Sequence, residues 1–476
     1  MSDPMKGYDL MFAVSELTLN AQFELLSVTG VLPARWTVPP NDEGYSIDVE
    51  LGMPKLRLFT PSGDNSSADL IVPLSSGSMT LMTLSHGEAV PVQHDVSGWY
   101  LVLHQDLAIA EIAAADAAAH KAVPDSVQTM LKHFDANDFS VQHVFMDMEN
   151  VDFSNEKGAF SLLPDKGAGP DTGSPMILMQ LNALVQSLVN SLKGSNNPFI
   201  FGYQAVDKVE SKSKASFTPV SATFTKYAVE AVERRALVFL CVTEGKAPPA
   251  VDVDLGYDPI QSHDVQASMT VDFKVVANFL LPPIADAGGF DVSKARITDN
   301  VASMSKANNY NGSVRMELSP LTNASTMRAT FQSDYHDVTI KDKLGTKIGT
   351  IEGVMEWFVD FNFAVDDKGK VSIATSHSSK VQDLHHKAKE NTMGKIEGWL
   401  ASVADELTKL LTFEQESGGF NDMVKHDWSK EVSVPLAAKF NDVSMNFVLP
   451  AGNILFFKDA LFDSAGNLRI DATYKD

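Results

Sequence analysis

The chain has 476 residues, of which 44% are hydrophobic and 21% are charged. These values are typical of a folded protein, and the length favours two large domains over a single core. The 61 acidic residues outnumber the 38 basic residues and give a formal charge of −23. This charge repels phosphate backbones and argues against a nucleic-acid partner, and anionic membrane surfaces are disfavoured for the same reason.

The single cysteine, Cys241, lies in the apolar run ALVFLCVTEG. It cannot form an intramolecular disulfide, so folding needs no oxidising compartment, and we expect a buried thiol. The opening MSDPMKGYDLMFA lacks the basic and apolar regions of a signal peptide, and no segment nears the roughly 20 apolar residues of a membrane span. The sequence predicts a soluble cytoplasmic protein with no transmembrane segment, and later release without a signal peptide stays open.

Most of the chain alternates like β-strands, and four apolar segments with helical spacing interrupt it. The helices are predicted at residues 11–26, 176–194, 271–282 and 394–413. Ser15 or Thr18 is a candidate N-cap for a shorter version of the first helix. Pro175 suits the first turn of the second helix and Gly194 lies just past its end, and Pro282 is expected to end the third helix. An antiparallel sheet is indicated by alternating segments at 45–59, 99–112, 143–154, 315–321, 355–365, 371–376 and 443–449.

The phrase ELTLNAQFEL at residues 16–25 matches DFKVVANFLL at residues 272–281, an offset of 256 (272 − 16) that places Phe23 on Phe279. Each phrase opens a half that runs helix, strands, long helix, strands. The closing segments SFTPVSATF with ALVFLCVTEG, and NFVLPAGNILFF with NLRIDATYKD, also match. The alternative is chance similarity between two amphipathic helices. We predict a duplicated unit with two domains, residues 1–250 and 251–476.

No motif for nucleotide, metal or covalent chemistry stands out, because GxxxxGK[ST], GxSxG and HExxH are missing and no GxGxxG follows a strand. Adjacent His385 and His386 point apart in a helix and are predicted to be solvated residues at a helix entry. Three dyads pair a histidine with an aspartate, but no nucleophile can be placed beside them: His94-Asp95, His263-Asp264 and His426-Asp427. We predict no catalytic residue, no metal site, no cofactor and no enzyme activity.

The second helix, MILMQLNALVQSLVNSLKG, is apolar over more than half of its circumference. Such a helix is expected to be enclosed. A curved sheet around it leaves an apolar channel suited to an acyl chain, in which each buried methylene contributes about 0.8 kcal/mol. The channel is either open to a ligand or filled by side chains, and both alternatives stand. The predicted groove-lining residues are Phe23, Leu178, Leu181, Val185, Leu188, Phe279, Trp399, Val403 and Leu407.

Four segments resemble the OrfX-type proteins of clostridial neurotoxin gene clusters, including the forty-seven-kilodalton member: GYDLMFAVSELTLNAQFELL, FTPVSATFTKY with ALVFLCVTEG, TVDFKVVANFLLPPI, and LPAGNILFFKDALFDSAGNLRIDATY. The resemblance covers essentially the full chain, and it departs at Tyr8, where the relatives tend to carry tryptophan. It implies the tubular lipid-binding (TULIP) superfamily, which includes bactericidal/permeability-increasing protein. The implied fold is α+β, with two tandem domains, each a long apolar helix wrapped in a curved antiparallel β-sheet.

The resemblance brings no catalytic residues. It implies non-enzymatic binding of a lipid or other apolar ligand in grooves between the long helices and the sheets. The alternative is a structural or accessory interaction protein with filled tubes, whose partner is another protein.

Overall fold

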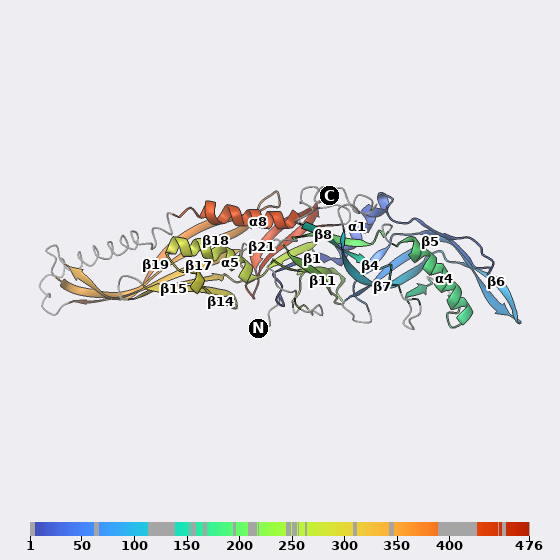
Figure 1. The fold of residues 1–476 in the computed structure, drawn as a ribbon, viewed down its shortest axis with the longest axis horizontal. Coiled ribbons are helices and arrows are strands. Elements are labelled where there is room, and N and C mark those ends of the chain that lie inside the picture. Colours follow the sequence, from blue (N-terminus) through green and yellow to red (C-terminus); the bar gives the residue numbers. More distant parts are fainter. Residues whose placement is uncertain are drawn as a thin grey trace.

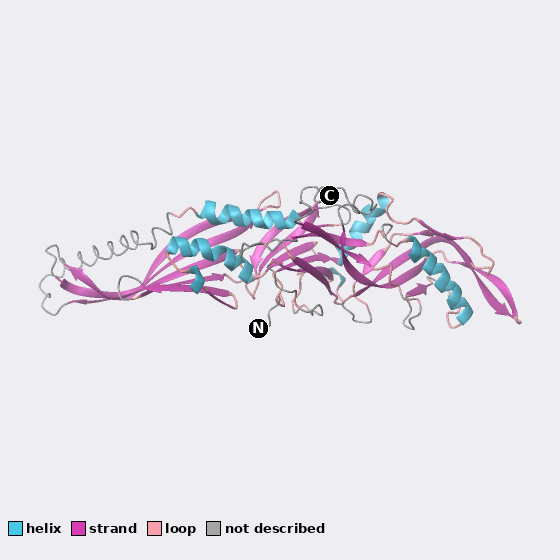
Figure 2. Ribbon diagram, in the orientation of Figure 1, coloured by secondary structure: helices cyan, strands magenta, loops and turns pink. Residues whose placement is uncertain are grey.

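The computed structural model is an elongated α+β molecule in which helices lie against twisted, curved sheets (Figures 1 and 2). It describes residues 5–60, 66–112, 139–151, 153, 159–164, 169–193, 197–207, 217, 219–243, 249, 255, 257–261, 264–307, 312–341, 347–388, 426–445, 447–449 and 454–475. The fourth predicted helix, residues 394–413, lies outside these residues.

Four α-helices fall within the described residues: α1 (Glu16–Val28), α4 (Pro175–Ser191), α5 (Phe273–Gly288) and α8 (Val434–Met445). Short helical turns are η2 (Val232–Arg234), η3 (Val292–Lys294) and η5 (Ser429–Ser433). None of the helices in the described part of the chain is both long and apolar enough to cross a bilayer.

The strands up to residue 250 are β1 (Leu10–Ser15), β2 (Arg35–Val38), β3 (Ser46–Leu51), β4 (Lys55–Arg57), β5 (Ser67–Ser85), β6 (Glu88–Asp95), β7 (Trp99–Ile112), β8 (Phe139–Met146), β9 (Phe160–Leu163), β10 (Ile200–Asp207), β11 (Ser221–Tyr227) and β12 (Ala236–Val242). The later strands are β13 (Ala267–Val271), β14 (Arg296–Thr298), β15 (Val301–Ala307), β16 (Ser313–Pro320), β17 (Thr326–Lys341), β18 (Lys347–Val365), β19 (Val371–Ala388), β20 (Phe447–Val448), β21 (Ile454–Phe462) and β22 (Leu468–Lys475).

These strands form two antiparallel sheets, as the alternating pattern predicted. The larger sheet has the order β11-β12-β1-β13-β22-β21-β20-β10-β8-β7-β5-β3-β2, with β4 and β6 paired to β5 and β9 paired to β7. The smaller sheet runs in sequence order from β14 to β19. The larger sheet therefore contains strands from both sides of residue 250, and the division into two domains stays a prediction.

Strand β1 occupies the middle of the molecule and pairs with β12 on one side and with β13 on the other. All six of its residues are buried, because both faces of the sheet are covered here. Phe12 faces the main core, whereas Met11 faces a second cluster that includes Tyr8 and Leu255. The prediction of a helix from residue 11 was wrong at this point, since an apolar run buried on both faces has the same pattern in a strand as in a helix.

Helix α1 begins at Glu16, directly after β1. The side chain of Ser15 caps it by accepting a hydrogen bond from the backbone N–H of Thr18 at 3.1 Å. The shorter version of the first predicted helix, with Ser15 as its cap, is therefore confirmed.

Helix α5 begins after Asp272, whose carboxylate accepts a hydrogen bond from the backbone N–H of Lys274 at 2.7 Å. It continues through Pro282 and Pro283 to Gly288, so the predicted end at Pro282 was wrong. A proline inside a helix forfeits a hydrogen bond and crowds the preceding turn, but the last turn is held by buried apolar residues such as Ile284. Gly289 ends the helix at φ 63°, a left-handed conformation that glycine adopts without strain.

Helix α8 occupies residues that the sequence pattern assigned partly to a strand. The predicted strand at 443–449 is helical through Met445, and only Phe447 and Val448 pair as a strand. Leu436 and Phe440, four residues apart, are fully buried and place α8 against β19 and β21. The alternation in the short segment VSMNFVL therefore did not distinguish strand from helix.

The cysteine lies where the sequence placed it. Cys241 is completely buried in β12, and its sulfur accepts a hydrogen bond from Gln204 Nε2 at 2.9 Å. Burial raises the pKa of this thiol to about 12. The thiol is therefore protonated and unreactive at neutral pH.

Candidate apolar ligand site

Helix α4 lies across the part of the larger sheet formed by β2, β3, β5 and β7 (Figure 1). Pro175 occupies its first turn, as predicted. Ile177, Leu181 and Leu188 recur at helical spacing and are buried against the sheet. The opposite face is open, since Leu178 is 42% exposed and Met179 is 58% exposed. The prediction that this helix is enclosed on all sides was therefore wrong, because the sheet covers only one of its faces.

A small apolar cavity lies under the carboxyl-terminal half of α4. Its volume is about 20 Å³. Leu188 and Leu192 form its roof, and strands β3, β5 and β7 supply its floor. The complete lining consists of Leu32, Pro33, Leu51, Gly52, Pro54, Leu70, Val72, Leu103, Leu188, Leu192 and Phe199. All of these are apolar residues, so the cavity offers contacts only to hydrocarbon.

The amino-terminal half of α4 is fastened to the sheet by one amide side chain. Gln180 is 3% exposed; its Oε1 accepts from the backbone N–H of Met82 at 2.7 Å, and its Nε2 donates to the Met82 carbonyl at 3.0 Å. Strand β3 begins at Ser46, opposite Thr80, so Met82 lies beyond the last pair between β3 and β5. Gln180 therefore supplies the donor and acceptor that a neighbouring strand would otherwise provide.

The same arrangement recurs on two other helices, and we call it an amide clasp. In each case an Asn or Gln side chain accepts from the N–H and donates to the C=O of one strand residue. The three clasps pair Gln180 of α4 with Met82 of β5, Asn20 of α1 with Leu56 of β4, and Asn441 of α8 with Val371 of β19. Each clasp joins a helix to backbone groups of the sheet that it covers.

The predicted groove residues occupy different environments. Leu188 lines the cavity. Leu181 and Val185 are 2% exposed and lie on the same helix face, toward the sheet. Leu178 is on the exposed face of α4 and is not part of the lining.

The remaining predicted groove residues are the two phenylalanines and three positions of the fourth helix. Phe23 is 1% exposed and packs edge-to-face on Phe199, a lining residue, so it supports the wall of the cavity from behind. Phe279 is half-buried and packs on Phe217, among residues that do not line this cavity. Trp399, Val403 and Leu407 lie outside the described residues.

Most of the lining was not predicted from the sequence. Leu70, Val72 and Leu103 alternate with outward-facing residues in β5 and β7, so their period-2 pattern carried a usable signal. Leu32 and Pro33 come from the loop after α1, where no periodic pattern marks the residues that face the core.

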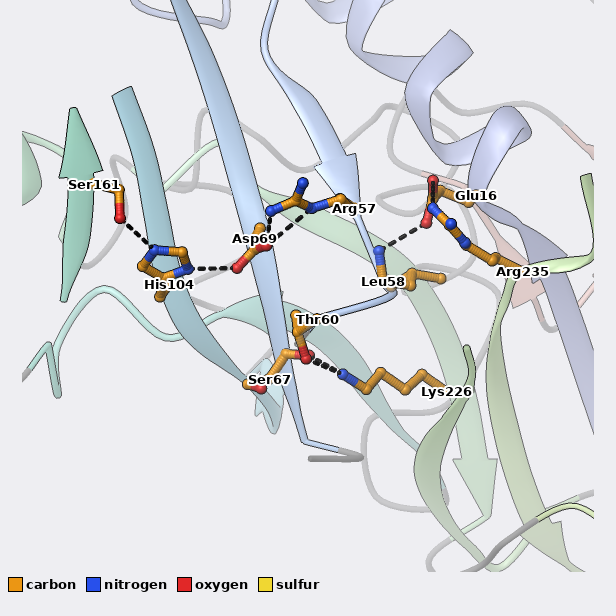
Figure 3. A network of polar contacts seen from close by, with 10 residues as sticks. All are labelled: Glu16, Arg57, Leu58, Thr60, Ser67, Asp69, His104, Ser161, Lys226 and Arg235. Carbon is orange, nitrogen blue, oxygen red and sulfur yellow. Dashed lines mark hydrogen bonds and ion pairs between the residues drawn. The ribbon is translucent and has the colours of Figure 1, made fainter. Parts of the chain in front are cut away.

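A row of polar side chains crosses the opposite face of these strands (Figure 3). Asp69 of β5 is paired in register with Arg57 of β4 and with His104 of β7. Its carboxylate accepts from Arg57 Nε at 2.9 Å and lies 2.6 Å from His104 Nδ1. His104 Nε2 lies 3.0 Å from the hydroxyl of Ser161 in β9. Burial alone would raise the pKa of Asp69, but the hydrogen bonds from His104 and Arg57 outweigh it and hold that pKa below its usual value.

Ser161, His104 and Asp69 follow the order of a serine hydrolase triad. Such a triad also needs a cavity for the acyl group and donors for the oxyanion. The apolar cavity lies on the other face of the strands and does not include Ser161. The row joins the edge strand β9 to β7, β5 and β4.

Further buried charges connect α1 and the segment after β4 to β11 and to Arg235, which directly precedes β12. Glu16, 4% exposed, accepts from the backbone N–H of Leu58 at 2.7 Å and from Arg235 at 3.3 Å. Burial raises the pKa of Glu16 despite these two partners. Lys226 donates to the hydroxyl of Thr60 at 3.2 Å (Figure 3).

The histidine dyads seen in the sequence do not form a shared site. The carboxylate of Asp95 accepts from the hydroxyl of Ser97 at 2.6 Å, while Nε2 of His94 is buried without a hydrogen-bond partner in the described structure. His426 Nε2 lies 3.1 Å from Glu431, and His263 is outside the described residues. His385 and His386 lie in β19, so their predicted position at a helix entry was wrong.

The fold defined by these elements is a mixed α+β fold of curved antiparallel sheets with helices packed on them. No protein-family model matches the chain, and no curated protein matches its sequence. Among solved structures, the chain is similar to P47 from Clostridium botulinum A2, with 10% identity, a TM-score of 0.53 and 98% of each chain covered.

It is also similar to P47 of Clostridium botulinum E1, with 12% identity, a TM-score of 0.53, and coverage of 98% of this chain and 99% of that chain. A lipopolysaccharide binding protein matches over 98% of this chain at 10% identity, but its TM-score of 0.30 is too low to establish a common fold. The resemblance to the forty-seven-kilodalton protein is thereby confirmed at the level of the fold.

Proposed function

We propose that the protein binds the hydrocarbon part of a lipid, or another apolar molecule, beneath α4 and catalyses no reaction on it. One observation carries this proposal. The cavity is lined only by apolar residues, and it lies between a helix and a sheet, which are separate elements of the fold. Apolar pockets between secondary-structure elements are common sites for small hydrophobic ligands.

The cavity must enlarge to hold such a ligand, because a volume of about 20 Å³ accommodates roughly one water molecule. When α4 lifts, Leu188 and Leu192 exchange their contacts with the sheet for contacts with the ligand. Burial of about ten methylenes contributes about 8 kcal/mol. Loss of the two hydrogen bonds of the Gln180 clasp costs about 2 kcal/mol. The hydrocarbon contribution therefore exceeds the cost of opening the clasp, and the surplus is available to offset the loss of translational and rotational freedom on association.

The test measures uptake of a fluorescent fatty acid by the full-length chain, together with native mass spectrometry of solvent-extracted protein. Leu188→Ala enlarges the cavity and is expected to increase uptake. Val72→Phe fills it and is expected to weaken uptake at least tenfold, at a cost in stability of about 1–3 kcal/mol. Near-ultraviolet circular dichroism checks that each variant is folded.

Leu436→Ala in α8 is the matched control. Leu436 is fully buried, so Leu436→Ala should cost about 2–5 kcal/mol, the range also expected for Leu188→Ala. Leu436 lies away from the cavity, so its substitution should leave uptake unchanged. Uptake that is equal in Val72→Phe and in the wild-type chain would contradict the proposal, as would the lack of any extracted or added ligand.

A second function, as a structural or accessory interaction protein, is favoured by aromatic packing in the middle of the molecule. The rings of Phe12 and Phe447 stack at 5.6 Å, and Phe239 meets Phe447 edge-on at 4.7 Å. A Cβ on Gly202 would lie 2.9 Å from the Phe239 and Phe447 rings, so this region is filled. A stoichiometric protein partner captured from the native host, without any lipid, would favour this function over the first.

We also infer that the chain consists of two related units of the tubular lipid-binding type. The helix caps Ser15 and Asp272 are 257 residues apart (272 − 15), and the strand starts Leu10 and Ala267 have the same offset (267 − 10). This offset is one residue larger than that of the sequence match, so it aligns Phe23 with Leu280 and not with Phe279. The strand order is symmetric about this point, with β11-β12-β1 on one side and β13-β22-β21 on the other. Co-expressed fragments 1–250 and 251–476 should purify together, and fragments that stay apart as stable monomers would contradict the inference.

A further inference from the structure

An open groove of about 620 Å³ lies beside η3 and the edge strand β14 in the smaller sheet. It is distinct from the apolar cavity, because most of its lining residues are polar or charged, and only Ala295, Met304 and Met316 are apolar. The residues that matter are Lys294, Arg296, Ser303, Ser305, Arg315 and Glu317. Three of these side chains are cationic and one is anionic, in a chain whose formal charge is −23.

The strand register places these side chains on one face of the sheet. Arg296 of β14 is opposite Ser303 of β15, which is opposite Glu317 of β16. Ser305 is opposite Arg315. Neighbouring strands are about 4.8 Å apart and alternate residues about 6.8 Å apart, so the Cα atoms of the two arginines are separated by roughly 12 Å. Two extended arginine side chains are long enough to reach one anion above the serines from this separation.

The cations of the groove keep most of their hydrogen-bonding capacity. The side chain of Arg296 is exposed and makes no hydrogen bond or ion pair in the described part of the chain. Arg315 is 62% exposed, and its Nη2 lies 3.6 Å from Asp334, which is beyond hydrogen-bond distance. Lys294, 74% exposed, lies 3.3 Å from Asp291, whose carboxylate also accepts from the hydroxyl of Ser293 at 2.6 Å.

We propose that this groove binds a sugar that carries a phosphate or sulfate group. Guanidinium groups such as those of Arg296 and Arg315 bind tetrahedral oxyanions through paired N–H donors. Glu317 repels a bare dianion but accepts hydrogen bonds from sugar hydroxyls, and Ser303 and Ser305 can donate or accept. The mixture of cations, hydroxyls and one carboxylate therefore matches a sugar ester better than it matches inorganic phosphate. This site is independent of the apolar cavity.

The experiment is isothermal titration calorimetry on the full-length chain. The probes are glucose 6-phosphate, a sulfated disaccharide, unmodified glucose and inorganic phosphate. Binding of either ester supports the proposal, and the ester that binds identifies the anion. Arg296→Gln and Arg315→Gln should each weaken ester binding about tenfold, because each removes a charge-assisted pair. Glu317→Gln should weaken ester binding and strengthen binding of inorganic phosphate.

Arg35→Gln is the matched control, since Arg35 is similarly exposed at 61% but is paired to Asp48 on β3, away from the groove. It should leave ester binding unchanged. The proposal is overturned if neither ester binds, if inorganic phosphate binds as tightly as the esters, or if the two arginine variants bind like the wild-type chain. All three substitutions in the groove change exposed side chains, so the folded chain remains available for each titration.

Discussion

Replacing Gln180 with leucine removes the clasp of α4 while keeping a buried side chain of similar size. The substitution abolishes the hydrogen bonds to the N–H and C=O of Met82 and a third bond, 3.1 Å long, to the carbonyl of Met176. A net hydrogen bond contributes about 1 kcal/mol, and a backbone group left unpaired costs about 1–3 kcal/mol. Met82 is half-buried, so water replaces part of the loss. We expect the free energy of unfolding to fall by about 2–4 kcal/mol.

Hydrogen exchange measured by mass spectrometry tests this directly, because peptides containing the Met82 amide and α4 should exchange faster in Gln180→Leu than in the wild-type chain, while peptides from β1 should exchange at the same rate in both. Denaturant unfolding gives the free energy. Gln186→Leu is the control, since Gln186 lies on the exposed face of the same helix and should change stability by less than about 0.5 kcal/mol. If Gln180→Leu exchanges like the wild-type chain, the clasp does not hold the helix and the reasoning is refuted.

Three other substitutions have defined outcomes. Asp69→Asn should cost about 3 kcal/mol at neutral pH, because it breaks a buried charge pair. The pKa of Asp69 is lowered, so its contribution is complete above the unfolded carboxyl value of about 3.9 and is lost as pH falls through the folded pKa. The free energies of unfolding of the variant and the wild type should therefore converge as pH falls, and a difference that stays constant with pH would contradict this. The contribution of Glu16 to stability depends on pH in the opposite direction, because burial raises the pKa of Glu16. The stability of Glu16→Gln relative to wild type should increase as pH rises from about 4.3 through the folded pKa, and a pH-independent difference would argue against it. Gly77→Ala should cost about 3 kcal/mol in denaturant unfolding, because φ is 122° and a Cβ would overlap the Asp48 carbonyl; unchanged stability would show that the strand can shift.

The sequence predicted the elements whose burial follows a simple period. Helix α4 lies within three residues of its predicted ends, and β7 matches the alternating segment 99–112. Pattern reasoning failed where burial is uniform, as in β1, or where packing outweighs local preference, as at Pro282 of α5. A period of two or 3.6 appears only when one face of an element is exposed, so β1 carried no directional signal.

The candidate site was accessible to sequence reasoning only in part. Leu188 was predicted because the apolar face of α4 is visible as a repeat. The clasp of Gln180 was not predicted, because a glutamine within a helix is usually solvated. Only the tertiary structure shows that Met82 lies beyond the end of β3 and hydrogen-bonds to Gln180 instead. Leu178 was predicted to line the groove but lies on the exposed face of α4. An apolar residue on the outer face of a helix cannot be distinguished from a core residue by its type alone.

The pairing of β1 with β13 has a geometric consequence. Phe12 is opposite Met269, and these residues are also related by the 257-residue offset (269 − 12), so the antiparallel pair is centred on equivalent positions. Two identical strand edges meet in this way when a two-fold axis passes between them. If the two units are related as proposed above, the β1–β13 pair is the covalently linked counterpart of a two-fold interface between two copies of one unit.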